Sequence, residues 1–534
     1  MNENLEYLRM FAQFPVSLHR FLRHTLTLDE AKAIVHQRME HREENFLQVA
    51  ERSIYSYAGS PYLPLLKMAG CELGDLRGLV KGHGLEGTLR RLREAGVYIT
   101  FEEFKGRKPI ERNGQTLAVS ASDFDNPRAK QDLTLQTGGS TGTAIKVGVD
   151  LDDIAARSPL EMIGLAAHGL LDAPSVRWTG ILPDGSLRNI LRSVRFRRMP
   201  ARWFSPSGLR DSRYWVKYGL ATYYMLTWLR LFGVRVPWPK TVEVDRAVVV
   251  ARGVADLLGV YGRCSVTTTV SRGMRVCLAA QEEGIDLRGA VFFGTSEPAT
   301  SAKVRLIVAS GAGLISSYGM VETNRIGIGC ARTGHCDDLH LHSDAFALFT
   351  HPYPVPGFGV TVPAFNITSL LPTASKVMLN IQMDDYGILE ERRCGCDLES
   401  YGYTTHIREI RSYSKLTGEG VTLIGNEIAR VLEEVLPTRF GGSPLDYQLV
   451  EQEDEQAFTR LYLVISPRVE IADEGLVIAV VLEALRDSSP MADAARSIWQ
   501  HTGTLQVKRM EPITTARGKQ FALRMLPRPG RDNS

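Results

Sequence analysis

A chain of 534 residues, 44% of them hydrophobic, is long enough for roughly two to four domains with large buried cores. Its 63 basic and 60 acidic side chains leave a formal net charge of +3, which gives no overall indication of a nucleic-acid or membrane partner. The seven cysteines fit a reducing compartment better than a disulfide framework, and the acidic N-terminus lacks the features of a signal peptide. We therefore expect a cytoplasmic protein that does not bind nucleic acid.

The first part of the chain has the pattern of amphipathic helices. Apolar residues recur at helical spacing over residues 28–54, and further short patterns follow as far as Leu92. Because the sequence there has no cluster of catalytic residue types, we interpret residues 1–115 as a helical N-terminal segment without chemistry. The longest apolar run, Tyr218–Val236, contains Arg230, Gly233 and Arg235, which argues against a transmembrane helix.

Strand-like and helix-like segments alternate from about residue 245 to residue 318. These segments are Cys264–Val270, Arg272–Glu283, Gly289–Gly294, Ala302–Ser310 and Leu314–Tyr318. Such alternation is typical of parallel strands joined by crossover helices. The C-terminal part has a different order of segments: Leu461–Ser466 (strand), Glu474–Arg486 and Ala492–His501 (helices) and Thr504–Arg509 (strand). We predict an α/β fold with a large domain of mostly parallel sheets over residues 116–410 and a small α+β lid domain over residues 411–534.

The segment Leu135–Lys146 contains three glycines and four hydroxyl residues between two apolar, strand-like stretches. Glycines let backbone N–H groups approach an anion closely, and Ser and Thr hydroxyls add further donors. Neither a Walker loop nor a G-x-G-x-x-G loop fits the spacing. A flexible surface turn has a similar composition, so the interpretation as a phosphate-binding loop depends on partners elsewhere in the chain.

Several motifs supply such partners. Thr137-Gly-Gly-Ser-Thr-Gly-Thr-Ala144 resembles the phosphate loop of the adenylate-forming acyl and aryl ligases, especially the phenylacetate–CoA ligase-like branch. Five later segments resemble further motifs of that family, in the family's order. Gly294–Pro298 resembles its Gly-Gly-Glu-Pro turn, Tyr318–Glu322 its Tyr-Gly-x-x-Glu segment and Asp384–Gly387 its Thr-Gly-Asp segment. Lys415–Val421 resembles its Gly-Glu-x-Val element and Thr514–Lys519 its C-terminal Gly-Lys. The resemblance covers residues 120–520.

The resemblance implies a site that makes an acyl adenylate from ATP and a carboxylic acid. It implies contacts to the phosphates from Thr137, Gly138, Gly139, Ser140, Thr141, Gly142 and Thr143, to adenine from Ser296, Glu297, Pro298, Tyr318 and Gly319, and to ribose from Asp385 and Arg411. Thr141, Glu322 and Lys519 would be catalytic, with Glu322 binding Mg²⁺, a cation that prefers hard oxygen ligands. Lys519 would reach the α-phosphate only in the first half-reaction, on a lid that pivots near Ser414–Lys415.

The chain also departs from the family's pattern. Ala144 and Ile145 stand where the family loop has Pro and Lys, and Lys146 comes one place late, so we assign Lys146 no phosphate role. The Gly-Gly-Glu-Pro turn reads Gly-Thr-Ser-Glu-Pro here.

A second group of residues has the character of metal ligands. It combines a Cys-x-Cys pair with an earlier cysteine and a histidine: Cys330, His340, Cys394 and Cys396. Thiolates and an imidazole from two separated clusters suit a closed tetrahedral Zn²⁺ site, and some phenylacetate–CoA ligase-like proteins carry similar segments. We predict a structural zinc ion on these residues, with His335 or Cys336 as rival ligands. Buried free thiols beside surface histidines are the alternative.

Residues 188–217 are strongly basic, with one acidic residue, Asp211, and several interleaved aromatic residues. The nine basic residues are Arg188, Arg192, Arg195, Arg197, Arg198, Arg202, Arg210, Arg213 and Lys217. In a nearly neutral protein such a stretch indicates an anionic partner. We keep three candidates, an acidic carrier protein, the phosphates of CoA and a peripheral anionic membrane surface, beside the alternative of a solvated insertion.

These patterns predict an AMP-forming acid–thiol ligase that uses ATP and Mg²⁺ and passes the acyl group to CoA. An acyl-protein synthetase acting on a carrier protein and an amide-forming ligase are alternatives, because both share the first half-reaction. A non-catalytic nucleotide-binding or scaffold protein is a further alternative, against which Glu322 and Lys519 argue. The acid itself is not predicted, since its pocket would be formed between Asp152 and Gly294.

Overall fold

The structure is a computed structural model of the whole chain. It describes residues 3–130, 132–137, 145–181, 186–206, 213–295, 299, 301–320, 322–333, 335, 337–354, 361–412, 415–418, 421–424, 431–442, 446–453, 459–485, 499–500, 502–513 and 523–525. All structural statements below refer to these residues.

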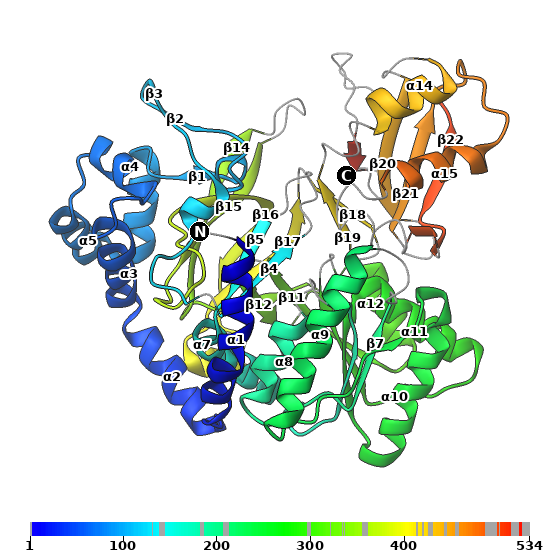
Figure 1. The fold of residues 1–534 in the computed structure, drawn as a ribbon, viewed down its shortest axis with the longest axis horizontal. Coiled ribbons are helices and arrows are strands. Elements are labelled where there is room, and N and C mark those ends of the chain that lie inside the picture. Colours follow the sequence, from blue (N-terminus) through cyan, green and yellow to red (C-terminus); the bar gives the residue numbers. More distant parts are fainter. Residues whose placement is uncertain are drawn as a thin grey trace.

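The N-terminal part is helical and packs on the main body of the molecule (Figure 1). Its α-helices are α1 (Glu3–Leu22), α2 (Leu28–Glu40), α3 (Arg42–Ala50), α4 (Tyr62–Met68), α5 (Leu73–Glu94) and α6 (Phe101–Phe104). A capping box starts α2, because Thr27 Oγ1 accepts from the Glu30 N–H (3.2 Å) and the Glu30 carboxylate accepts from the Thr27 N–H (2.8 Å). Arg38 then joins α2 to α7 (Leu151–Ala167) by donating to the Ala156 carbonyl at 2.6 Å.

One half of a 13-stranded sheet is parallel, in the order β11-β10-β9-β6-β7-β8. Its strands are β6 (Ser175–Trp178), β7 (Arg202–Ser205), β8 (Lys240–Thr241), β9 (Cys264–Thr269), β10 (Ala290–Thr295) and β11 (Gly313–Met320). The helices between them are α8 (Ser186–Val194), α9 (Arg213–Leu231), α10 (Ala247–Tyr261), α11 (Val270–Glu282) and α12 (Ser301–Ala309). Val176, Val266 and Phe292, all 0% exposed, pack in the core of this half. The expected alternation of parallel strands and crossover helices is confirmed here.

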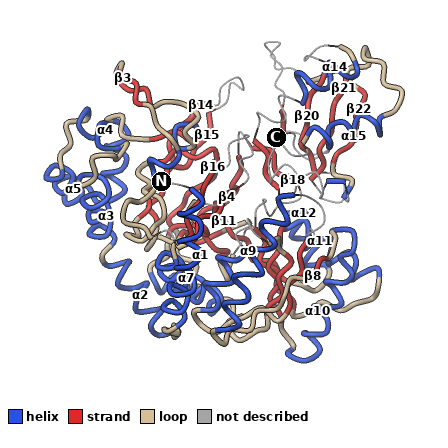
Figure 2. The backbone as a smooth tube through the Cα atoms, in the orientation of Figure 1, coloured by secondary structure: helices blue, strands red, loops and turns tan. Residues whose placement is uncertain are grey.

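The other half of the sheet is mainly antiparallel and continues from β11 (Figure 2). Its strands are β12 (Asn324–Gly329), β13 (Leu339–Leu341), β14 (Phe346–Pro354), β15 (Thr361–Ser369), β16 (Ile381–Glu391) and β17 (Thr405–Ser412), with β1 (Ile99–Thr100) added in parallel to β16. Because β11 pairs in parallel with β10 and antiparallel with β12, it joins the two halves. Its last residues, Tyr318–Met320, therefore lie at the junction.

The C-terminal part forms a separate four-stranded sheet, at the upper right of Figure 1. It consists of β20 (Tyr447–Glu453), β21 (Thr459–Ile465), β22 (Leu505–Arg509) and β23 (Leu523–Met525), with α14 (Leu436–Phe440) and α15 (Glu474–Ala484). Its own core includes Leu449, Leu463 and Val477. The α/β fold class with a smaller α+β unit is confirmed, whereas the boundaries after residues 115 and 410 stay predictions. The expected helix Ala492–His501 lies mostly outside the described residues.

Three antiparallel strand pairs complete the described strands. They are β2 (Ile110–Arg112) with β3 (Gln115–Leu117), β4 (Leu133–Thr137) with β5 (Ile145–Val149), and β18 (Lys415–Gly418) with β19 (Val421–Ile424). Within the described part of the chain, no helix has both the length and the apolar character needed to span a bilayer.

Candidate active site and metal centre

Tyr318 and Asp385 come together at the junction of the sheet halves. The Tyr318 hydroxyl, at the end of β11, donates to the Asp385 carboxylate on β16 at 2.8 Å, although 67 residues separate them. Burial, and then the charge of Asp385, raise the pKa of Tyr318, so its hydroxyl stays protonated and donates. Gly319 follows at a break in the register, and a Cβ there would lie 2.1 Å from the Asn324 carbonyl oxygen, so only glycine fits. The resemblance assigned adenine and ribose contacts to this pair.

Glu322 lies in the short connection from β11 to β12 and forms a buried ion pair with Lys105. The two side chains are 8% and 11% exposed. Burial acts to raise the pKa of Glu322, but the charge and hydrogen bond of Lys105 outweigh it and lower the pKa to about 2. The carboxylate therefore stays ionised, as an Mg²⁺ ligand must be. Its oxygens offer more lone pairs than one ammonium group occupies, so Glu322 fits an Mg²⁺ ion that shares it with Lys105.

The sequence did not indicate Lys105. The residue lies 217 positions from Glu322, at the C-terminal end of the four-residue helix α6, and is one of 63 basic residues. A second cation, Lys376, is 4% exposed, and its charge also acts on Glu322. Lys376 itself pairs with Asp125 at 2.5 Å. Glu322 thus lies in a positively charged, buried environment.

Several predicted site residues are not described by the structure: Gly138, Gly139, Ser140, Thr141, Gly142, Thr143, Ser296, Glu297, Pro298 and Lys519. The residues that flank the phosphate-loop motif, Thr137 and Ile145, are cross-strand partners in the β4–β5 pair. The backbone of Arg411 lies on β17 opposite Tyr386, directly after Asp385. The roles of all these residues stay predictions.

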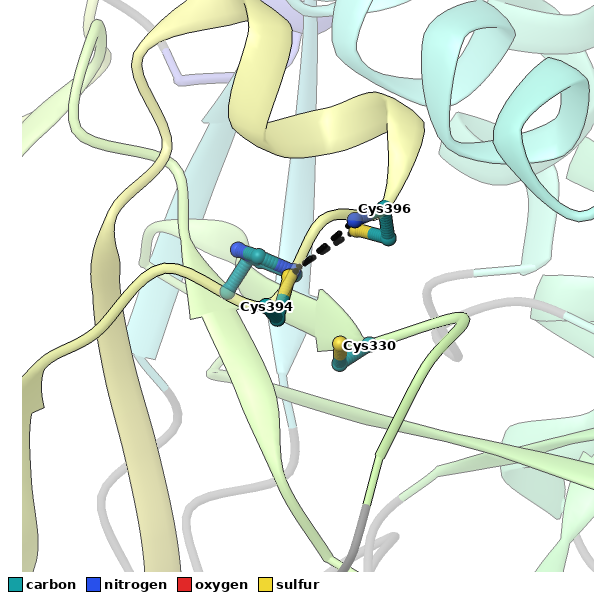
Figure 3. A group of neighbouring side chains, drawn as sticks. Cys330, Cys394 and Cys396 are labelled. Atoms are coloured by element: carbon teal, nitrogen blue, oxygen red, sulfur yellow. Dashed lines mark hydrogen bonds between the residues drawn. The ribbon is translucent and has the colours of Figure 1, made fainter.

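The four predicted metal ligands lie within reach of one ion, and Figure 3 shows the three cysteines among them side by side. One donor atom from each of Cys330, His340, Cys394 and Cys396, a sulfur or a ring nitrogen, lies within 4.8 Å of all the others. His340 Nε2 is 3.2 Å from the Cys396 sulfur and 3.5 Å from the Cys394 sulfur. A tetrahedral zinc ion with Zn–S and Zn–N bonds of about 2.3 and 2.0 Å places its ligand atoms about 3.5 Å apart. The donor set and its spacing therefore fit Zn²⁺.

Hydrogen bonds from neighbouring groups orient these ligands and influence their protonation. His340 Nδ1 lies 2.6 Å from the Tyr403 carbonyl, so a proton on Nδ1 leaves Nε2 free for a metal. The backbone N–H groups of Arg332 and Cys396 donate to the sulfurs of Cys330 and Cys394, each at 3.4 Å. Hydrogen bonding from Cys330 lowers the pKa of Cys396 against the effect of burial. Four protein ligands leave no open position, which favours a structural ion.

The rival ligands do not join this group. His335 is exposed and its backbone N–H donates to Thr333 Oγ1 at 2.9 Å, while Cys336 lies outside the described residues. A second possible donor set combines Cys330 with Asp338 and His406. Asp338 already binds Arg392 and the His406 Nδ1, the latter at 2.7 Å. The Cys/His set is therefore the better metal site.

The basic stretch has a different arrangement from the expected docking face. Arg188 and Arg192 are 5% and 4% exposed, so they belong to the interior. Arg195 donates to the carbonyls of Phe21 and His24 at 2.6 and 2.7 Å, and Arg198 donates to carbonyls that include that of Ala173 at 3.0 Å. Arg195 and Arg198 thus join chain segments, and the expectation that Arg188 and Arg192 lie on a surface for an anionic partner is wrong. The side chains of Arg210, Arg213 and Lys217 are outside the described set.

The two-part sheet with a separate C-terminal sheet is the fold of the adenylate-forming ligases. A solved 2-hydroxyisobutyryl-CoA ligase, in complex with 2-HIB-AMP and CoA, is similar with a TM-score of 0.50 and 14% identity, over 92% of this chain and 90% of that chain. The same ligase in its postadenylation state has a TM-score of 0.43 and 15% identity, over 94% and 90% of the two chains. The amide bond synthetase Mcba of Marinactinospora thermotolerans has a TM-score of 0.42 and 12% identity, over 85% and 84%.

At these identities the first match shows the fold alone. No protein-family model matches the chain, and no curated protein sequence matches it.

Proposed function

We propose that the protein is an ATP-dependent, AMP-forming ligase that activates a carboxylic acid as its adenylate and transfers the acyl group to a thiol. The observation that carries this proposal is the 2.8 Å hydrogen bond between Tyr318 and Asp385. It joins the two residues that resemble the family's adenine and ribose contacts, at the junction of the sheet halves. The buried, ionised Glu322 beside the same strand end supports the proposal.

Each described residue has a physical task in this reaction. Tyr318 fixes the Asp385 carboxylate through its hydroxyl, and carboxylate oxygens are acceptors suited to ribose hydroxyls. Glu322 supplies an oxygen ligand for Mg²⁺, which would offset negative charge on the phosphates. Lys105 keeps that carboxylate ionised and in place. The phosphate-loop residues around Thr141 would add donors, and Lys519 a positive charge at the α-phosphate.

We further propose CoA as the acceptor and the phenylacetate–CoA ligase-like branch as the relationship. The Cys/His cluster supports the branch, because similar segments occur in some of its members. An acidic carrier protein and an amine are the competing acceptors, and both leave the adenylation step unchanged. Zinc would act by fixing the connections between strands.

The test is ATP–pyrophosphate exchange with a library of carboxylic acids, followed by transfer of the acyl group to CoA, carrier proteins and amines. We expect exchange that depends on one class of acid and on Mg²⁺, and thioester formation with CoA. If exchange occurs but the acyl group is transferred only to a carrier protein or only to an amine, that molecule is the acceptor in place of CoA. Absence of exchange with every acid would favour the non-catalytic alternative.

A further inference from the structure

A buried group of charged residues lies next to the proposed active site. It consists of Arg157 and Glu161 on α7, Arg192 on α8, Arg325 on β12 and His342 directly after β13. Arg157, Glu161, Arg192 and His342 are 2%, 7%, 4% and 1% exposed, and the Arg325 side chain is 12% exposed. Buried arginines are uncommon unless an anion is paired with them.

The packing of α7 against β12 brings this group together. Arg157, Glu161 and Gly164 share one face of α7, because they are spaced four and three residues apart. A Cβ on Gly164 would lie 2.5 Å from the Ile328 side chain, so the helix backbone lies close against β12. As a result Arg325 Nη1 pairs with Glu161 Oε2 at 3.2 Å.

The described charges of the group do not balance. Arg157 has its own carboxylate, since its Nε lies 2.8 and 3.0 Å from the Asp153 oxygens. Glu161 pairs with Arg325, and the charge of Arg192 also acts on it. The Arg192 side chain donates a hydrogen bond to the neutral amide oxygen of Asn189. Arg192 and Arg325 thus share the Glu161 carboxylate, on which the charges of Arg177 and Arg198 also act, and an uncompensated buried charge is costly.

Polar atoms of the same group are also unsatisfied. Arg157 Nη1 and Arg192 Nε have no hydrogen-bond partner within the described residues. A buried N–H without an acceptor destabilises the folded state. A bound carboxylate would provide two acceptor oxygens for the unpaired N–H groups and one negative charge to balance the excess positive charge.

The group adjoins the residues proposed to bind the nucleotide. Arg325 is the cross-strand partner of Gly319, directly after Tyr318. The Arg325 guanidinium also lies 5.9 Å from the ring centroid of Phe293, on the strand that leads into Gly294–Pro298. An anionic group bound here would therefore be close to the site of acid activation.

We propose that Arg192 and Arg325 bind a second acid group of the substrate, so that the enzyme activates dicarboxylic acids at the carboxyl group remote from these arginines. This inference rests on the proposed function. It predicts that dicarboxylates support pyrophosphate exchange with a kcat/KM at least about tenfold higher than that of monocarboxylates of equal length.

The first experiment measures binding without catalysis. The melting temperature of the wild type is compared in succinate, glutarate, butyrate and inorganic phosphate, each against sodium chloride of equal ionic strength. We expect stabilisation by a dicarboxylate beyond that by butyrate or chloride, loss of this effect in Arg192→Gln, and partial retention in Arg192→Lys. Arg288→Gln, which removes an exposed arginine paired with Asp286, is the matched control and should respond as the wild type does. No dicarboxylate-specific stabilisation of the wild type would overturn the proposal, whether or not the variants fold.

The second experiment compares exchange rates with the same acids. A preference for dicarboxylates that Arg192→Lys reduces supports the inference. Equal rates with monocarboxylates would overturn it while leaving the ligase function intact. Stabilisation by phosphate alone would also overturn it, since the site would then bind free phosphate. Exchange with no acid at all would refute the ligase function, and the melting data would still decide whether the arginines bind a dicarboxylate.

Discussion

Glu322 is held ionised inside the protein by a cation from a distant part of the chain. Its carboxylate is 8% exposed, and burial alone would favour the neutral form. Lys105 reverses that preference, because a buried opposite charge in direct contact favours the ionised form. The same contact means that Lys105 and a divalent cation compete for the Glu322 oxygens. Lys105 is thus a positioning residue for the proposed Mg²⁺ ligand.

We expect Lys105→Met to destabilise the protein, because it leaves Glu322 buried without its partner. Breaking a buried ion pair in this way typically costs about 3–5 kcal/mol. Mn²⁺ or Mg²⁺ should restore more stability to the variant than to the wild type, since the cation replaces the missing charge. Thermal unfolding with and without the metal measures both effects. Lys130→Met, which removes a lysine that is 66% exposed from its pair with Asp152, is the control and should change little. Equal metal responses in all three proteins would contradict the competition.

His342 is a buried titratable group whose neighbours oppose its protonation. Burial, and then the charges of Arg325, Arg192 and Arg157, lower its pKa to about 3. A histidine in the unfolded chain titrates near 6.5. The unfolded state therefore binds more protons below that pH, so the contribution of neutral His342 to stability is complete above pH 6.5. It is lost progressively as the pH falls towards 3.

We expect His342→Asn to flatten the dependence of stability on pH between about 6.5 and 4. Over that interval the wild type should lose on the order of 3 kcal/mol more than the variant. Denaturant unfolding at several pH values measures the difference. His36→Asn changes a histidine that is 66% exposed and should preserve the wild-type slope. Parallel curves for His342→Asn and the wild type would show that His342 is protonated in the folded protein at these pH values.

At the scale of elements, the Cys/His cluster joins three segments of the antiparallel half of the sheet. Cys330 follows β12, His340 lies on β13, and Cys394 and Cys396 follow β16. The β12–β13 pair extends over only three registered positions, so an ion bound at its end would stabilise the pairing of these two strands. The chain between Cys330 and Cys394 includes β16, the strand that carries Asp385. The strand β12, which pairs with the strand of Tyr318, ends directly before Cys330.

We expect the purified protein to contain about one zinc ion per chain, and Cys394→Ser combined with Cys396→Ser to remove it. A loss of about 3 kcal/mol in a domain of this size lowers the melting temperature by roughly 6–12 °C. Elemental analysis and calorimetry measure the two effects. Cys264→Ala, at a buried cysteine on β9 outside the cluster, should keep its zinc. Zinc-free protein from a preparation without chelators would refute the site.

Local sequence patterns predicted the elements better than they predicted the contacts between them. The strands around Cys264–Val270 and Gly289–Gly294 could be predicted, because an apolar run between two helical patterns is visible in consecutive residues of the sequence. Lys105 was not, because its partner is 217 residues away. Arg188 and Arg192 were interpreted as surface residues because charge usually indicates exposure. Their four-residue spacing on α8 was the available signal that they share one buried face.

At the scale of the whole molecule, the chain has two separately packed parts. The large sheet carries Tyr318, Glu322 and Asp385, while the C-terminal sheet has its own core around Leu449 and Leu463. Most of that core comes from the small part, and Val244 of the large part is buried in the same cluster. A lid that pivots near Ser414–Lys415 is consistent with this division and stays a prediction.

A substitution of Lys519 can test whether the C-terminal part acts in only one of the two half-reactions. We expect Lys519→Ala to lower pyrophosphate exchange by about 10²–10³-fold, because a charge aimed at the transition state is typically worth about 3–4 kcal/mol. Transfer to CoA from a supplied acyl adenylate should remain close to the wild-type rate, because that step does not form the phosphoryl transition state. Arg468→Ala removes a positive charge from an exposed position of the same part and should leave both rates unchanged. If Lys519→Ala slowed both steps equally, Lys519 would be needed throughout the cycle, and the lid would not exchange roles between the half-reactions.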